Sequence, residues 1–190
     1  MKKLGKVFIL SSVPRLILAG ACFCLLFPFD GTKGQTSAVF AATPLKLPPS
    51  ESYKIVKRDS KDFKEIKAVF ENLIAAGKKA DLGGIMSFFS KNYLNSGREI
   101  NDAMKQWKQI VDHFVDLELQ HPIYQIEISG NFAKIRCEGV LVGIPKGHDE
   151  VVEIDSWKLA VHNVIKEDGK WKILGDQVPY DTGRTFHPLF

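Results

Sequence analysis

The spacing of the apolar residues changes near residue 115, and this change constrains the fold more than any other feature of the chain. Between residues 59 and 114, apolar residues recur every three or four positions, which is typical of helices that bury one face. From Val115 to Val178 they mostly alternate with polar residues, which is typical of half-buried strands. Helices followed by antiparallel strands predict an α+β domain, with the helices packed on one face of a sheet.

Three helices are predicted in the first half of the domain. The first runs from about residue 60 to 79 and is capped by Asp59 or Ser60. Asp81 can cap a short second helix. The third helix is expected to follow an S-x-x-E capping box that Ser96 and Glu99 form.

The second half predicts strands at 115–120 and 124–128, long strands at 132–144 and 151–165, and a last strand at 171–178. We expect the two long strands to pair so that facing residue numbers sum to 296, which keeps charged residues on one face. Glu138 then faces Lys158 and Lys134 faces His162, with Cys137 and Trp157 directed toward the helices. In this register His162 points away from the pocket.

The N-terminal segment has the organisation of a signal peptide. Lysines at its start precede an apolar run of 14 residues, 16–29, which is shorter than the ~20 that span a bilayer. Cleavage after Ala41 or Ala42 predicts a periplasmic or secreted protein with no membrane contact. The alternative is an uncleaved N-terminal membrane anchor. Residues 42–58 are rich in proline and predict an extended linker.

The charge distribution argues against nucleic acid as a partner. Residues 1–41 hold five basic groups and one acid, so removing them leaves 21 basic and 21 acidic side chains. These charges are interspersed, whereas nucleic-acid binding needs a clustered basic surface. Cys137 is the one cysteine after the leader, so no disulfide can form within the mature domain.

Two segments resemble the nuclear transport factor 2 (NTF2)-like superfamily, which includes SnoaL-like domains. These are FENLIAAGKKADLGGIMSFFSKNYL at 70–94 and the hairpin VIKEDGKWKILGDQ at 164–177. The resemblance covers about residues 60–178, within a domain predicted at 59–178. It implies a cone of three helices on a curved, mostly antiparallel sheet, with an internal pocket and frequent homodimers through the sheet face. The superfamily contains isomerases, dehydratases and members without chemistry, so the fold alone does not specify function.

The ketosteroid-isomerase branch of the superfamily supplies a specific test. Its catalytic tyrosine and two acids would fall near Leu73, at Asn95 or Ser96, and near Val161 of this chain. None of these residues can perform the required proton transfer. The sequence therefore argues against that chemistry.

Six side chains are candidates to line the pocket, and two of them, Asp155 and Tyr93, would be the acid–base pair of an enzyme. Asp155 shares strand parity with Trp157, but we favour a solvent-exposed strand end for it, because burying a carboxylate is costly. The pocket candidates are Tyr93, Trp107, Tyr124, Asp155, Trp157 and Gln177.

The histidines and the cysteine predict neither a metal site nor a cofactor. The five histidines lie far apart, without H-x-x-H spacing. His113 and His148 are expected in solvent, and Cys137 is expected to be an inert core residue. The sequence therefore favours a non-catalytic envelope module that binds a small apolar ligand or a protein. The alternatives are an isomerase- or dehydratase-type enzyme and an accessory domain for an envelope enzyme.

The tail at 179–190 contains aromatic residues but has no regular period. It predicts no helix or strand. Either it is mobile, or its aromatic side chains dock on the domain or on a partner.

Overall fold

The computed structural model describes residues 43–180 and 189–190 of the 190-residue chain. The predicted signal peptide at 1–41 lies outside the described residues, as do residues 181–188 of the tail. No helix in the described part is both long enough and apolar enough to cross a membrane.

The first two helices form where their caps and apolar spacing predict them. α1 (Lys61–Lys78) begins after Ser60, whose hydroxyl accepts a hydrogen bond from the first turn. α2 (Leu82–Met86) begins after Asp81, whose carboxylate accepts the Gly84 backbone N–H at 2.8 Å. Each cap satisfies a backbone donor that the helix itself cannot pair.

The third helix, α3 (Ile100–His113), has a different cap from the predicted one. Its N-cap is Glu99, which exchanges side-chain and backbone hydrogen bonds with Asp102. The predicted box of Ser96 and Glu99 is therefore wrong. Ser96 has a φ of 48° in the turn before the helix, and its hydroxyl donates to Asp176 at 2.7 Å.

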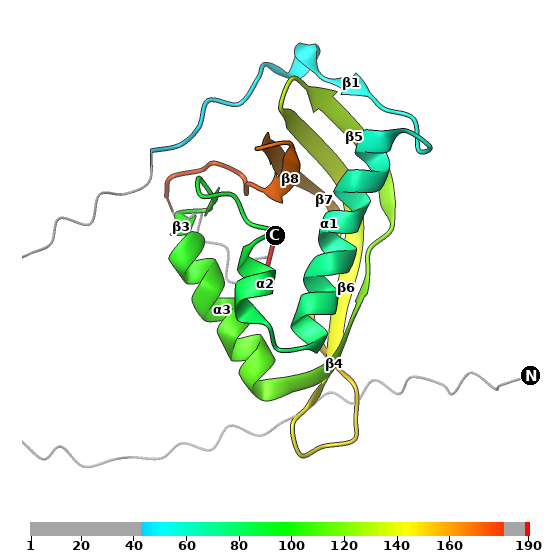
Figure 1. Cartoon of the computed structure of the whole chain (residues 1–190), viewed down its shortest axis with the longest axis vertical. Helices are drawn as coiled ribbons and strands as arrows, with labels where there is room; N and C mark the ends of the chain where they lie inside the picture. Colours follow the sequence, from blue (N-terminus) through cyan, green and yellow to red (C-terminus); the bar gives the residue numbers. More distant parts are fainter. Residues whose placement is uncertain (1–42, 181–188) are drawn as a thin grey trace, which may run out of the picture. The chain divides into compact units, whose positions relative to one another are not determined.

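An antiparallel sheet, whose strands differ in length, forms the second layer. The three helices lie on one side of it in Figure 1. β6 is its central strand: one edge pairs with β7, while β5 and β4 pair with successive halves of the other edge. The predicted α+β layout is therefore confirmed. The strands of this sheet are β1 (Lys54–Ile55), β4 (Phe114–Gln120), β5 (Ile123–Ser129), β6 (Phe132–Pro145), β7 (Val152–Glu167) and β8 (Lys170–Ile173).

A short ribbon of β2 (Leu94–Asn95) and β3 (Arg98–Glu99) leads into α3. The ribbon contacts the segment after β8. β8 itself ends at Ile173, so it is shorter than the predicted strand at 171–178. Gly175 and Gln177 have φ values of 79° and 62° and so interrupt the extended backbone. Gln177 then donates to the Leu174 carbonyl at 2.8 Å.

The predicted linker follows the domain closely. The Leu45 N–H donates to the Gln177 side chain at 2.8 Å, and a single 3-10 turn, Ser50–Ser52, precedes β1. β1 pairs with β5 through Lys54 and Ile128. The segment at 43–58 thus contains a 3-10 turn and adds an edge strand to the sheet.

The predicted register is right in the middle of the β6–β7 hairpin and wrong beyond it. Gly139 pairs with Trp157, in agreement with the sum of 296, but Cys137 pairs with Ala160 and Ile135 with His162. The residue numbers of these outer pairs sum to 297.

A β-bulge explains the difference. Lys158 and Leu159 both lie opposite Glu138, and Leu159 has a φ of 50°. The extra residue reverses the facing of every β7 side chain beyond it. His162 therefore points into the interior, where it is 4% exposed, while Leu159 is 84% exposed. The prediction that His162 points away from the pocket is wrong.

Candidate functional site

Six aromatic side chains meet in the interior between the helices and the sheet, and we call this group the interior aromatic cluster. Their neighbouring ring centroids lie between 4.4 and 6.2 Å apart, mostly edge to face or tilted. Such arrangements are favoured by the ring quadrupoles. The cluster consists of Phe70 of α1, Trp107 of α3, His121 after β4, Trp157 and His162 of β7, and Phe190.

The end of the described chain occupies the centre of this cluster. Phe190 is 3% exposed, and its ring lies 5.3 Å from Phe70 and 5.4 Å from Trp157. The Leu189 N–H donates to Asp155 Oδ2 at 3.1 Å, and Asn95 Nδ2 reaches the Phe190 carbonyl at 3.4 Å. Figure 1 shows this red segment among the helices. Of the two outcomes predicted for the tail, docking on the domain is the one observed for these residues.

Asp155 lies inside the protein and not at a solvated strand end. It is 2% exposed, which corrects the expectation of an exposed position. Burial raises the pKa of its carboxyl, because a low-dielectric environment disfavours the charged form. It lines a surface hollow of about 290 Å³ together with Leu189 and residues of α3 such as Gln106 and His113. Asp155 therefore contacts the buried Leu189 and also lines a hollow at the surface.

Several polar atoms of this interior have no hydrogen-bond partner among residues 43–180 and 189–190. They are Trp107 Nε1, Trp157 Nε1, Asp155 Oδ1, His121 Nε2 and His162 Nε2. An unpaired buried polar atom costs about 1–3 kcal/mol, so native interiors rarely retain several of them without a reason. These atoms are available to a polar group of a bound molecule.

The register also brings Cys137 beside two histidines. Cys137 is fully buried on β6, as predicted, and one ligand atom from each of Cys137, His121 and His162 lies within 4.8 Å of the others. Burial lowers the pKa of His121 to about 4 and that of His162 to about 3. Both imidazoles are thus neutral near pH 7, whereas burial raises the pKa of the Cys137 thiol to about 11. These residues are the ones that could hold a metal.

The remaining predicted pocket residues lie elsewhere. Tyr93 is buried against Phe89, with ring centroids 5.2 Å apart, and burial raises the pKa of its hydroxyl above the ordinary value. Tyr124 is 45% exposed on β5 and lies outside the interior, in contrast to the prediction. Gln177 is buried but binds backbone groups of its own loop and of the linker. Trp107 and Trp157 belong to the interior aromatic cluster.

Four members of the cluster are not among the pocket residues that the sequence predicts: Phe70, His121, His162 and Phe190. His121 follows the end of a strand, His162 depends on the bulge, and Phe190 lies in an aperiodic tail. The sequence signal that does identify the region is Gly139. An added Cβ there would lie 2.3 Å from the Trp157 ring, so the glycine makes room for the tryptophan.

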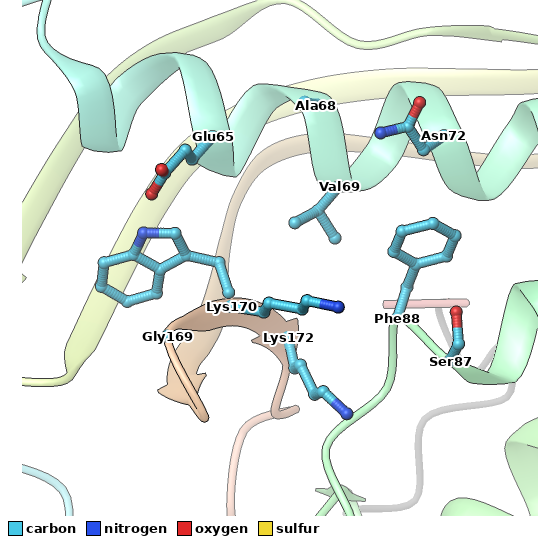
Figure 2. Close-up of a pocket in the computed structure, with 10 residues that line it drawn as sticks. Glu65, Ala68, Val69, Asn72, Ser87, Phe88, Gly169, Lys170 and Lys172 are labelled. Carbon is cyan, nitrogen blue, oxygen red and sulfur yellow. The ribbon is translucent and has the colours of Figure 1, made fainter.

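A second hollow, of about 560 Å³, lies between α1 and β8 and is open to solvent. Figure 2 shows Glu65 and Asn72 on α1, with Lys170 and Lys172 on the β8 side and Phe88 at one end. Its charged groups belong to long side chains at the surface. The interior aromatic cluster, with its buried unpaired atoms, is therefore the stronger candidate site.

No family model and no curated protein matches the sequence. Among solved structures, a conserved protein from Planctomyces limnophilus has a TM-score of 0.51 at 18% identity, covering 60% of this chain and 91% of that one. An NTF2-like family protein from Streptomyces avermitilis has a TM-score of 0.47 at 10% identity, covering 60% and 91%. This chain therefore shares the fold of the Planctomyces limnophilus protein, and its three helices on an antiparallel sheet agree with the layout that the resemblance to the NTF2-like superfamily implies.

A ketosteroid isomerase-like protein from Erwinia carotovora atroseptica is similar to this chain with a TM-score of 0.43 and 13% identity, over 61% of this chain and 93% of that one. A shared fold does not specify a function, so the function has to be argued from the site. In the described part of this chain, that site is the interior between helices and sheet.

Proposed function

We propose that this chain is an exported NTF2-like domain that binds a small aromatic or apolar ligand without chemical conversion. The ligand would occupy the interior aromatic cluster in place of Leu189 and Phe190. The observation that carries this proposal is the position of the Phe190 ring, between Phe70 and Trp157.

The contacts of this segment indicate which ligand chemistry the site accepts. A ring at the position of Phe190 meets aromatic edges and faces from α1, α3 and β7. A donor at the position of the Leu189 N–H meets the buried carboxyl of Asp155. The best ligand is therefore an uncharged aromatic molecule that carries one N–H or O–H group.

The titratable groups of the interior are poorly suited to proton transfer near pH 7. A general base works best when its pKa lies near the operating pH. The pKa values of His121 and His162, about 4 and 3, lie well below that range. The sequence pairs Tyr93 with Asp155 in an enzyme, but Tyr93 packs against Phe89, whereas Asp155 accepts the Leu189 N–H.

One observation favours an enzyme as the second candidate. Asp155 has a raised pKa and lies at a hollow, which are features of a general acid. A convergent second group would be needed, and among the described residues Tyr93 does not supply it. Turnover of a bound molecule that Asp155→Asn abolishes would favour this alternative.

The proposal can be tested by removing the occupant. We expect deletion of residues 189–190 to leave a cooperatively folded chain that binds the neutral fluorophore N-phenyl-1-naphthylamine, which carries one N–H donor. The intact chain should bind it at least tenfold more weakly. Tyr180→Ala, a change at an exposed residue of the same tail, is the matched control and should behave as the intact chain.

Two results would contradict the proposal. If the deleted chain loses cooperative unfolding, Leu189 and Phe190 belong to an obligatory core and not to a replaceable occupant. If it remains folded but binds the fluorophore no better than the Tyr180→Ala control, the interior is not a ligand site.

We also propose that the outer face of the sheet supports a homodimer. Apolar side chains are exposed there, among them Tyr124, Leu159 and Val161. Light scattering of the intact chain should give twice the monomer mass, and Leu159→Lys should return it to one.

A further inference from the structure

Three elements place a histidine–cysteine group at one side of the interior aromatic cluster. Cys137 lies on β6 and His162 on β7, while His121 follows β4. One ligand atom from each residue lies within 4.8 Å of the other two. Their spacing in the sequence resembles no metal motif, because the bulge at Leu159 and the turn after β4 create the group.

The histidines present unpaired nitrogens in a buried setting. Nε2 of His121 and Nε2 of His162 are buried and have no hydrogen-bond partner within the described part of the chain. His162 is 4% exposed, and a backbone hydrogen bond with Phe190 helps to orient its ring. A second hydrogen bond that orients the ring is typical of metal-binding histidines.

The distances fit a metal site that has not closed around an ion. In a three-coordinate site with metal–nitrogen bonds of about 2.0 Å and a metal–sulfur bond of about 2.3 Å, ligand atoms lie roughly 3.5 Å apart. The ligand atoms, which lie within 4.8 Å of one another, must therefore approach one another by about 1 Å to bind an ion. Side-chain rotations can supply this movement.

Thiolate and imidazole bind several metals, and the apolar surroundings of this group favour the metal that leaves no net charge. Cu(I) and one thiolate have no net charge together, whereas Zn²⁺ and one thiolate would leave a positive charge in an interior walled by Phe70, Trp157 and Phe190. Zn²⁺ also requires a fourth ligand in most protein sites. Among the described residues, the group offers three.

We propose that His121, Cys137 and His162 form a three-coordinate site for Cu(I). Binding forms one copper–sulfur bond and two copper–nitrogen bonds. It releases the Cys137 thiol proton to solvent, and the oxidation state of copper does not change. This inference does not depend on the proposed aromatic ligand.

His121 supplies the route of entry. Cys137 is inaccessible, but His121 is only partly buried and lines a surface hollow of about 330 Å³ with Phe70 and Leu119. An ion can reach the imidazole of His121 from this hollow and then pass to the two buried ligands. A metal site needs such a path as well as its ligands.

The test uses the full chain, purified anaerobically without a histidine tag. All variants carry Cys22→Ser and Cys24→Ser, because these leader cysteines would otherwise bind copper. Cu(I) is titrated in competition with bathocuproine disulfonate, whose copper complex absorbs visible light. We expect one equivalent of Cu(I) per chain to be withdrawn from the chelator.

The variants identify the ligands. His121→Ala, His162→Ala and Cys137→Ala should each weaken binding by more than the 10–100-fold that loss of an outer-shell contact costs. His113→Ala is the matched control, since it removes an exposed histidine at the end of α3 and should bind as the parent does. Circular dichroism establishes that each variant is folded.

X-ray absorption at the copper edge identifies the ligands in the parent chain, so it remains informative even if a variant fails to fold. In the copper-loaded parent it should report one sulfur and two nitrogen neighbours. Three results would overturn the inference: no binding by the parent, binding that survives Cys137→Ala, or a copper shell without sulfur. Retention of Zn²⁺ against an excess of Cu(I) would overturn the assignment to copper.

Discussion

Lowering the pH from 7 to 5 is expected to destabilise the metal-free fold by about 4 kcal/mol, because two buried histidines must stay neutral in it. The ordinary histidine pKa is 6.5, and burial lowers it to about 4 for His121 and about 3 for His162. At pH 5 both histidines are protonated in the unfolded chain but remain neutral in the folded chain. Each histidine then contributes about 1.36 kcal/mol for each of the 1.5 pH units below 6.5, or about 2 kcal/mol.

The sign follows from which state binds the proton. A group whose pKa is lower in the folded state stabilises the fold above the unfolded pKa, and this stability is lost as the pH falls through 6.5 toward the folded pKa. The result at pH 5 is insensitive to the folded values as long as both lie well below 5. Asp155 acts in the opposite direction, because its raised pKa favours folding at lower pH. The contribution of Asp62, whose pKa is lowered, is lost only below about pH 4.

Urea unfolding at pH 7 and pH 5, with copper and zinc chelators present, measures this difference. The double variant His121→Leu/His162→Leu should lose most of the pH dependence, and each single variant about half of it. His113→Leu alters an exposed histidine and should retain all of it. The reasoning would be refuted if the double variant kept the full pH dependence, or if the parent were equally stable at both pH values.

Two further predictions concern the backbone around the site. For the monomer, at chain concentrations below those at which the proposed dimer forms, Leu159→Gly should raise the free energy of unfolding in urea by about 1 kcal/mol, since Leu159 has a φ of 50° and is 84% exposed. Val161→Gly, outside the bulge, should lower it, and equal effects would argue against the bulge. Gly139→Ala should lower the thermal stability by about 1–3 kcal/mol and alter the tryptophan fluorescence, because the new methyl would lie 2.3 Å from the Trp157 ring. Gly83→Ala has its nearest contact at 3.6 Å and should leave both signals nearly unchanged, so an unchanged Gly139→Ala protein would contradict the packing.

Local sequence determined the order and type of the elements. The caps at Ser60 and Asp81 lie beside the backbone groups that they satisfy, so the residues that form them are close in the sequence. Period-two alternation likewise predicts which side chains of one strand share a face, and Cys137 is buried as expected. The pairing of Gly139 with Trp157 also followed, because a missing side chain opposite a large one is visible in the sequence.

Only the tertiary structure decided what fills the interior. A single residue in a left-handed conformation, Leu159, reverses the direction in which the His162 side chain points. The sequence does not predict this conformation, because leucine rarely adopts it. The packing of Phe190 beside Phe70 and His162 joins segments far apart in the chain, which no local period encodes. The candidate copper ligands and the occupant of the pocket therefore arise from long-range contacts, whereas the scaffold that holds them arises from local ones.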